Sequence, residues 1–244
     1  MRVPTALHAI GVAAETNTAT LNMLSSGLYS SAGVTGVSAT NVGAINSALD
    51  SSSVNGAASD TTAEVQAIVD SYNAILHSAD GMGGNTTIPL SAAQYSAIGV
   101  TGVSGPASAG TALHLLNDVV DTFTMTAVDT VPELQAMATA ANHIIAAAGG
   151  TLAAARAITH ADLFALGISY GDESSITKLQ DALHALTSSA AVDTRDELAN
   201  LAQQSQLIVQ ICLPLPPEVP PQPIICYCDP LALMQPSSPP VMMA

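Results

Sequence analysis

The stretch Asp129–Gln135 (DTVPELQ) marks the start of a helix, and related stretches occur at Asp60–Gln66 (DTTAEVQ) and Asp193–Ala199 (DTRDELA). In each of them a threonine precedes a glutamate by three residues, which is the capping-box pattern of a helix N-terminus. The three capping pairs are Thr61 with Glu64, Thr130 with Glu133, and Thr194 with Glu197. A helix is therefore expected to begin after each threonine.

The residues that follow each capping box support these helices. Their apolar positions recur at steps of three and four residues, which trace one face of an α-helix. In the first copy these positions are Val65, Ile68, Val69, Tyr72, Ile75 and Leu76. In the second they are Leu134, Met137, Ala138, Ala141, Ile144 and Ile145, and in the third Leu198, Leu201, Ala202, Ser205, Ile208 and Val209.

A second phrase precedes each capping box. Tyr29–Val37 (YSSAGVTGV) matches Tyr95–Val103 (YSAIGVTGV), and Phe164–Ser169 (FALGIS) is a looser copy. A short helix that ends at a glycine in the left-handed conformation fits this phrase. The expected C-terminal cap glycines are Gly33, Gly99 and Gly167.

A further amphipathic segment lies between the two phrases in each copy, such as Val42–Leu49 in the first. The expected fold is therefore all-α, with tandem small three-helix units of about 65 residues each. The expected boundaries are 1–28 for a truncated repeat, 29–88, 89–155 and 156–210 for helical repeats 1 to 3, and 211–244 for a tail. Within the truncated repeat, Leu7–Val12 resembles the end of a short helix, and Thr20–Leu28 is expected to be its middle helix.

The tail at 211–244 has a different composition. It is rich in proline, which favours extended polyproline II over a helix, and we expect it to be disordered. All the cysteines of the chain lie in it, at Cys212, Cys226 and Cys228. The sequence leaves three interpretations of these cysteines: they bind a metal, they form an intermolecular disulfide, or their thiols have no function.

The charge balance limits the classes of partner. The chain has 4 Lys and Arg residues against 19 Asp and Glu residues, for a net charge of −15. So few cations cannot neutralise a phosphate backbone, which excludes nucleic acid as a partner. The longest apolar run, Ile144–Ala155, is too short to span a bilayer, so membrane insertion is not expected.

Motifs for chemistry are absent. The chain contains no Gly-x-Ser-x-Gly, no His-Glu-x-x-His and no EF-hand loop, so no catalytic residue, cofactor or resident metal is expected. Calcium remains an alternative, because Asp60, Asp129 and Asp193 recur beside the capping threonines. A carboxylate there also favours the positive end of the helix dipole, and we prefer that structural interpretation.

The two phrases, which together cover roughly residues 29–210, resemble a tandem repeat of very large bacterial secreted and cell-surface proteins of the adhesin type. The resemblance rests on Gly33–Val37, Gly99–Val103, Asp60–Ala67 and Asp129–Ala136. It implies a spacer or adhesive stalk outside the cell, without catalytic residues. Its partners would be neighbouring repeats and a host or cell-surface protein or glycan.

We therefore expect a non-enzymatic repeat segment of an exported surface protein. A calcium-responsive helical binding module is the alternative, and an enzyme ranks last. The expected location is extracellular or at the cell surface. However, Pro4 and His8 interrupt the apolar N-terminal stretch, so it makes a poor signal peptide, and a cytoplasmic location stays open.

Overall fold

The computed structural model describes residues 3–83, 89–171 and 175–211, and among them side chains within 6–206. The described residues form eleven α-helices and three short 3-10 helices, and they contain no strand beyond one isolated bridge between Asp80 and Thr124. The predicted all-α class is therefore confirmed for this part of the chain. The expected disorder of the tail and its three cysteines concern 212–244, outside the described residues.

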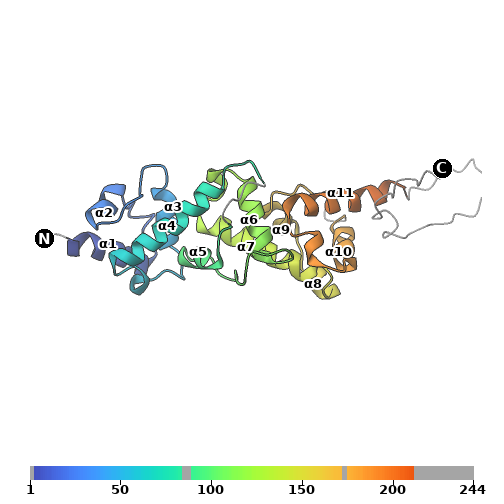
Figure 1. The fold of residues 1–244 in the computed structure, drawn as a ribbon, viewed down its shortest axis with the longest axis horizontal. Helices are drawn as coiled ribbons and strands as arrows, with labels where there is room; N and C mark the ends of the chain where they lie inside the picture. Colours follow the sequence, from blue (N-terminus) through green and yellow to red (C-terminus); the bar gives the residue numbers. More distant parts are fainter. Residues whose placement is uncertain (1–2, 84–88, 172–174, 212–244) are drawn as a thin grey trace, which may run out of the picture. The chain divides into compact units, whose positions relative to one another are not determined.

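The helices follow a recurring order of short helix, middle helix, 3-10 turn and long helix (Figure 1). The short helices are α2 (Ser26–Ser31), α5 (Ala92–Ala97) and α9 (His160–Ala165), and the middle helices are α3 (Val42–Leu49), α6 (Ala112–Thr122) and α10 (Ile176–Ala185). The 3-10 turns are η1 (Gly56–Ala58), η2 (Met125–Ala127) and η3 (Ser189–Ala191), and the long helices are α4 (Thr62–Ser78), α7 (Val131–Ala147) and α11 (Arg195–Ile211). Two helices stand outside this order, namely α1 (Val3–Thr16) and α8 (Leu152–Arg156).

Each long helix buries the face that its apolar periodicity predicts. All six predicted positions of α4 are buried, and so are the first five of α7, while Ile145 is partly buried. In α11 the four predicted positions with described side chains are buried as well. Burial of these faces joins the helices into one hydrophobic core within Met1–Gln210.

The long helices pack on both sides along the chain. α4 contacts the middle helix α3 that precedes it and the short helix α5 that follows it. α7 contacts α6 before it and α9 after it in the same way. These contacts cross the expected boundaries at 88 and 155, and the described residues up to Gln210 belong to one compact unit.

The N-terminal segment differs from the expectation. Leu7–Val12 lies inside the continuous helix α1, and Gly11 lacks the positive φ that Gly99 adopts (+92°). The expected middle helix at Thr20–Leu28 is also wrong, because residues 20–23 form a turn and α2 begins at Ser26. The local match to Gly-Val was misleading because Ile10, Ala13 and Ala14 bury a helical face across the glycine.

α1 instead makes a contact like those of the long helices. It contacts the short helix α2 that follows it, as α4 contacts α5 and α7 contacts α9. Its Val3-Pro4 start repeats the Val131-Pro132 start of α7. In this register three of the four buried residues of α1 correspond to buried residues of α4, namely Ala6 to Val65, Ile10 to Val69 and Ala13 to Tyr72, whereas Ala14 corresponds to the partly buried Asn73.

Candidate functional site: repeated clasps between turns and long helices

Capping boxes fix the start of the long helices. Thr61 Oγ1 accepts from the backbone N of Glu64 at 3.2 Å, and Glu64 Oε2 accepts from the backbone N of Thr61 at 3.0 Å. The Thr130–Glu133 pair makes the same bonds at 3.5 and 3.1 Å, and the Thr194–Glu197 pair at 3.3 and 3.2 Å. The hydrogen bonds from Thr61 lower the pKa of Glu64.

The expected cap glycines lie at the ends of the short helices. Gly33, Gly99 and Gly167 have φ values of +83°, +92° and +69°. The residue after each glycine donates its N–H back into the helix, as Val100 does to the carbonyl oxygen of Tyr95 at 3.0 Å. This is the Schellman pattern, and it turns the chain toward the following long helix.

A glutamine on the long helix holds each of the first two turns by two hydrogen bonds to the backbone of a threonine, and we call this pair of bonds a clasp. Gln66 Oε1 accepts from the backbone N of Thr35 at 2.8 Å, and Gln66 Nε2 donates to the carbonyl oxygen of Thr35 at 3.1 Å. Gln135 makes the same two bonds to Thr101, at 2.8 and 3.1 Å. The third copy has Ala199 at this position, so it lacks the clasp.

An asparagine two turns further along the helix adds a second attachment. Asn73 Nδ2 donates to the carbonyl oxygen of Gly36, and Asn142 Nδ2 donates to that of Gly102, both at 3.0 Å. Each turn is thus held at two points by the long helix that follows it. Our sequence analysis missed this function of the glutamines and asparagines, although both types recur at the same offset from the capping threonine.

A buried amide joins each of the first two short helices to its middle helix. Tyr95 donates its hydroxyl to Asn117 Oδ1 at 3.0 Å, and Asn117 Nδ2 donates to the carbonyl oxygen of Leu90 at 2.8 Å. Tyr29 and Asn46 form the same bridge, with an O–O distance of 2.7 Å. All four side chains are buried, so the amides are satisfied inside the core.

The third copy builds this bridge from different residues. Gln180 Nε2 donates to the carbonyl oxygen of Ile158 at 2.9 Å, and Arg156 donates to Gln180 Oε1 at 3.0 Å in place of a tyrosine hydroxyl. Leu163 fills the buried tyrosine position, whereas Phe164 is 85% exposed. The aromatic residue of the third phrase is therefore shifted by one position from the place of Tyr29 and Tyr95.

A further bond reaches from each of the first two middle helices to a long helix later in the chain. The backbone N of Val131 donates to Ser47 Oγ at 2.9 Å, and the backbone N of Arg195 donates to Asp118 Oδ2 at 2.7 Å. Burial raises the pKa of Asp118, and the bond from Arg195 opposes this rise. These bonds tie α3 to α7 and α6 to α11.

The three calcium candidates lie in different surroundings. Asp60 and Asp129 are exposed, and each has a raised pKa, caused chiefly by Glu64 for Asp60 and by desolvation for Asp129. Asp193 is buried and accepts a hydrogen bond from the backbone N of Gly110. Across the described residues, no three or more His, Cys, Asp and Glu side chains gather into a group that could hold a metal ion.

A histidine–carboxylate pair also has a structural explanation. His143 Nδ1 lies 2.9 Å from Asp162 Oδ1. The other carboxylate oxygen accepts from the backbone N and the hydroxyl of Thr159, at 2.8 and 2.7 Å. Asp162 is therefore part of the capping box of α9, which explains its position without catalysis.

The chain matches no family model, no curated protein and no solved structure. Within the described ranges, no helix combines the length and apolar character that crossing a bilayer demands.

Removal of one clasp should have a measurable effect. We expect Gln135→Ala to lower the free energy of unfolding by about 1–2 kcal/mol, because the backbone of Thr101 loses two partners. Gln204→Ala, at an exposed position of α11, is the matched control and should change stability by less than about 0.5 kcal/mol. Urea unfolding followed by circular dichroism measures the free energy of unfolding of both variants. Equal losses of stability in Gln135→Ala and Gln204→Ala would show that the clasp does not stabilise the fold.

Three buried tyrosines predict unfolding at high pH. Burial raises the pKa of Tyr29, Tyr72 and Tyr95 above the value of about 10 in an unfolded chain. The unfolded state therefore loses these protons first, so the contribution of the three tyrosines to stability is constant below about pH 10 and falls as the pH rises above it. Absorbance at 295 nm should rise in a cooperative step that coincides with loss of helical circular dichroism. A tyrosine titration complete before the helices unfold would contradict this.

Proposed function

We propose that this chain is a non-enzymatic segment of tandem repeat units that acts as a spacer or adhesive stalk of an exported surface protein. The observation that carries the proposal is the recurrence of the same clasp at Gln66–Thr35 and Gln135–Thr101. These polar side chains connect elements of the chain to one another. Such a use of polar groups suits a structural segment better than a catalytic one.

The proposed unit comprises a short helix, a Gly-Val-Thr-Gly-Val-type turn, a middle helix and a capped long helix. α4 and α7 each serve two units, because each holds the turn before it and contacts the short helix after it. A repeat of this kind is stabilised by contacts between neighbours, so its length can change by whole units. That property is what a spacer requires.

The charge and the repeated phrases favour a location outside the cell. A net charge of −15 with 4 cationic residues keeps a chain soluble. The resemblance to repeats of bacterial adhesin-type proteins points to the same location. A host or cell-surface protein or glycan, together with neighbouring repeats, would be the partners of such a segment.

Antibody labelling of cells that produce the protein tests the proposed location. We expect antibodies raised against residues 3–211 to label intact cells, and protease treatment of those cells to remove the signal. An antibody against a cytoplasmic protein, which should label only permeabilised cells, is the control. Labelling that requires permeabilisation would contradict the proposal.

A calcium-responsive module is the second candidate, favoured by the electrostatic interaction of Asp60 with Glu64 and of Asp129 with Glu133. A bound cation would relieve the repulsion within each pair. Calorimetric titration of the chain with calcium should then release heat and raise the melting temperature, and Asp129→Asn should reduce both effects. No heat and no change in melting temperature would remove this candidate.

A further inference from the structure

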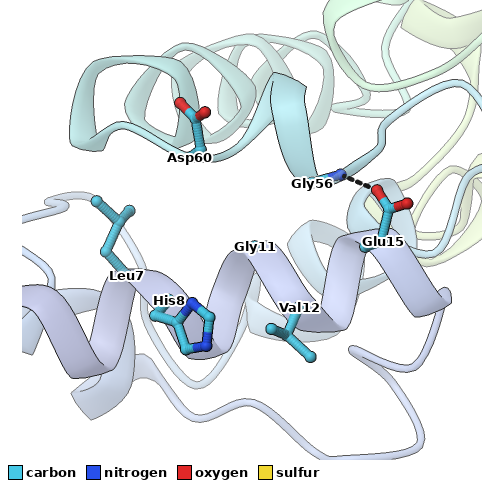
Figure 2. A pocket seen from close by; sticks show the side chains of 7 residues that line it. All are labelled: Leu7, His8, Gly11, Val12, Glu15, Gly56 and Asp60. Carbon is cyan, nitrogen blue, oxygen red and sulfur yellow. Dashed lines mark hydrogen bonds between the residues drawn. The ribbon is translucent and has the colours of Figure 1, made fainter.

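A groove of about 390 Å³ runs between α1 and the segment Gly56–Asp60. Figure 2 shows Leu7 and Glu15 rising from α1 toward that segment, and Glu15 Oε2 accepts from the backbone N of Gly56 at 2.9 Å. Leu7 and Gly11 line the groove, and Val12 at its edge is 48% exposed. A helix face on which Leu7, Gly11 and Val12 lie beside His8 and Glu15 is thus partly open to solvent.

The same face is covered on the two internal long helices. In the register that matches the buried residues of α1 and α4, Leu7 occupies the position of Gln66. The Val3-Pro4 start of α1 likewise places Leu7 at the position of Gln135. Gln66 and Gln135 are the side chains that hold the Gly-Val-Thr-Gly-Val turns.

The first of these turns also passes close to an apolar side chain of its long helix. Val34 and Val100, which follow the first glycine of each turn, are buried in the core. In the turn at Gly36, a Cβ added to the glycine would lie 3.7 Å from Val69 Cγ1 of α4, so the backbone passes close to the helix. Leu7 and Gly11 form an apolar surface against which a turn of this kind can pack, although α1 has no glutamine at the clasp position.

We propose that the groove on α1 receives the Gly-Val-Thr-Gly-Val-type turn of another unit of the same repeat. The inference rests on the proposed repeat organisation, and it identifies α1 as the surface that the other unit contacts. Continuity with the faces of α4 and α7 selects this occupant.

A fusion protein tests the proposal with the partner supplied in the same chain. A second copy of Asp60–Thr130 is placed directly before Val3, so that the junction Thr130-Val3-Pro4 repeats the native Thr130-Val131-Pro132. Hydrogen exchange is then measured on peptides from α1, which remain unique in sequence. We expect the α1 amides to exchange about tenfold more slowly in the fusion than in the original chain.

Two variants of the fusion show whether the turn itself is responsible. Gly102→Val in the added copy places a β-branched residue where φ is +77°, so it should abolish the extra protection of α1. Leu7→Gln recreates the clasp residue, so it should increase the protection of α1 in the fusion and not in the original chain. Both changes leave residues 60–130 of the original chain unaltered.

The outcomes are decisive in both directions. Slower exchange of α1 that depends on Gly102 of the added copy supports the proposal. Unchanged exchange of α1 overturns it, whether the added copy folds separately or stays unfolded. Surface labelling of cells does not involve the groove, so failure of the proposed function and failure of this inference are distinguishable.

Discussion

Replacement of Gly99 by alanine is expected to lower the free energy of unfolding by about 2–4 kcal/mol. Gly99 ends α5 with a φ of +92°, a conformation that strains any residue with a Cβ. The added Cβ would also overlap Oγ and Cβ of Ser51, whose hydroxyl donates to the carbonyl oxygen of Gly99 at 3.2 Å. Backbone strain and overpacking therefore act together at this position.

Gly105→Ala is the matched control for that variant. Gly105 has a similar φ of +81°, but an added Cβ would meet no heavy atom within 4 Å. We expect only the backbone cost, about 1–2 kcal/mol. Urea unfolding followed at 222 nm compares the two variants. If Gly105→Ala lost as much stability as Gly99→Ala, close packing of the turn against Ser51 would be disproved.

The second large effect is expected for Asn117→Ala, which should cost about 2–4 kcal/mol. Asn117 is only 4% exposed, and it is the partner of both the Tyr95 hydroxyl and the Leu90 carbonyl oxygen. Truncation leaves these two groups buried without their partner and opens a small cavity. The loss is therefore larger than that of an exposed hydrogen bond.

A double-mutant cycle isolates the bridge. Tyr95→Phe removes the hydroxyl alone, and its effect should be smaller once Asn117 is already alanine, with a coupling energy of about 0.5–3 kcal/mol. Tyr29→Phe with Asn46→Ala gives the same cycle in the preceding bridge and should show coupling of similar size. Purely additive losses in both cycles would mean that the two side chains act independently.

Local signals in the sequence were sufficient for the long helices α4 and α7. A capping box and an apolar stripe lie within one segment, so Thr130, Glu133 and Leu134 could be interpreted without knowledge of the fold. The clasps could not be derived in this way. Gln135 and Thr101 are far apart in the sequence, and a polar residue on a helix is by default expected to face solvent.

Two errors have a common physical cause. Short apolar phrases fit more than one structure, because burial depends on what packs against them. Ile10-Gly11-Val12 resembles Ile98-Gly99-Val100, yet only Gly99 ends a helix. The alignment of Phe164 with Tyr29 and Tyr95 failed similarly. The buried position lies four residues before the glycine, and in the third copy Leu163 occupies it.

If the chain is built from repeats as proposed, its long helices are interchangeable. Deletion of Thr62–Thr130 joins Thr61 directly to Val131 and puts α7 in the place of α4. Gln135 then faces Thr35, and Asn142 faces Gly36, in the positions that Gln66 and Asn73 occupy. Deletion of Thr62–Pro132 is the control, because two further missing residues rotate the joined helix by about 200°.

Amide hydrogen exchange at Thr35 in the two deletion variants is the most direct test. Repeat organisation predicts that the Thr35 amide stays protected after deletion of Thr62–Thr130 and exchanges rapidly after deletion of Thr62–Pro132. Equal exchange of Thr35 in the two variants would contradict the claim that α7 can replace α4.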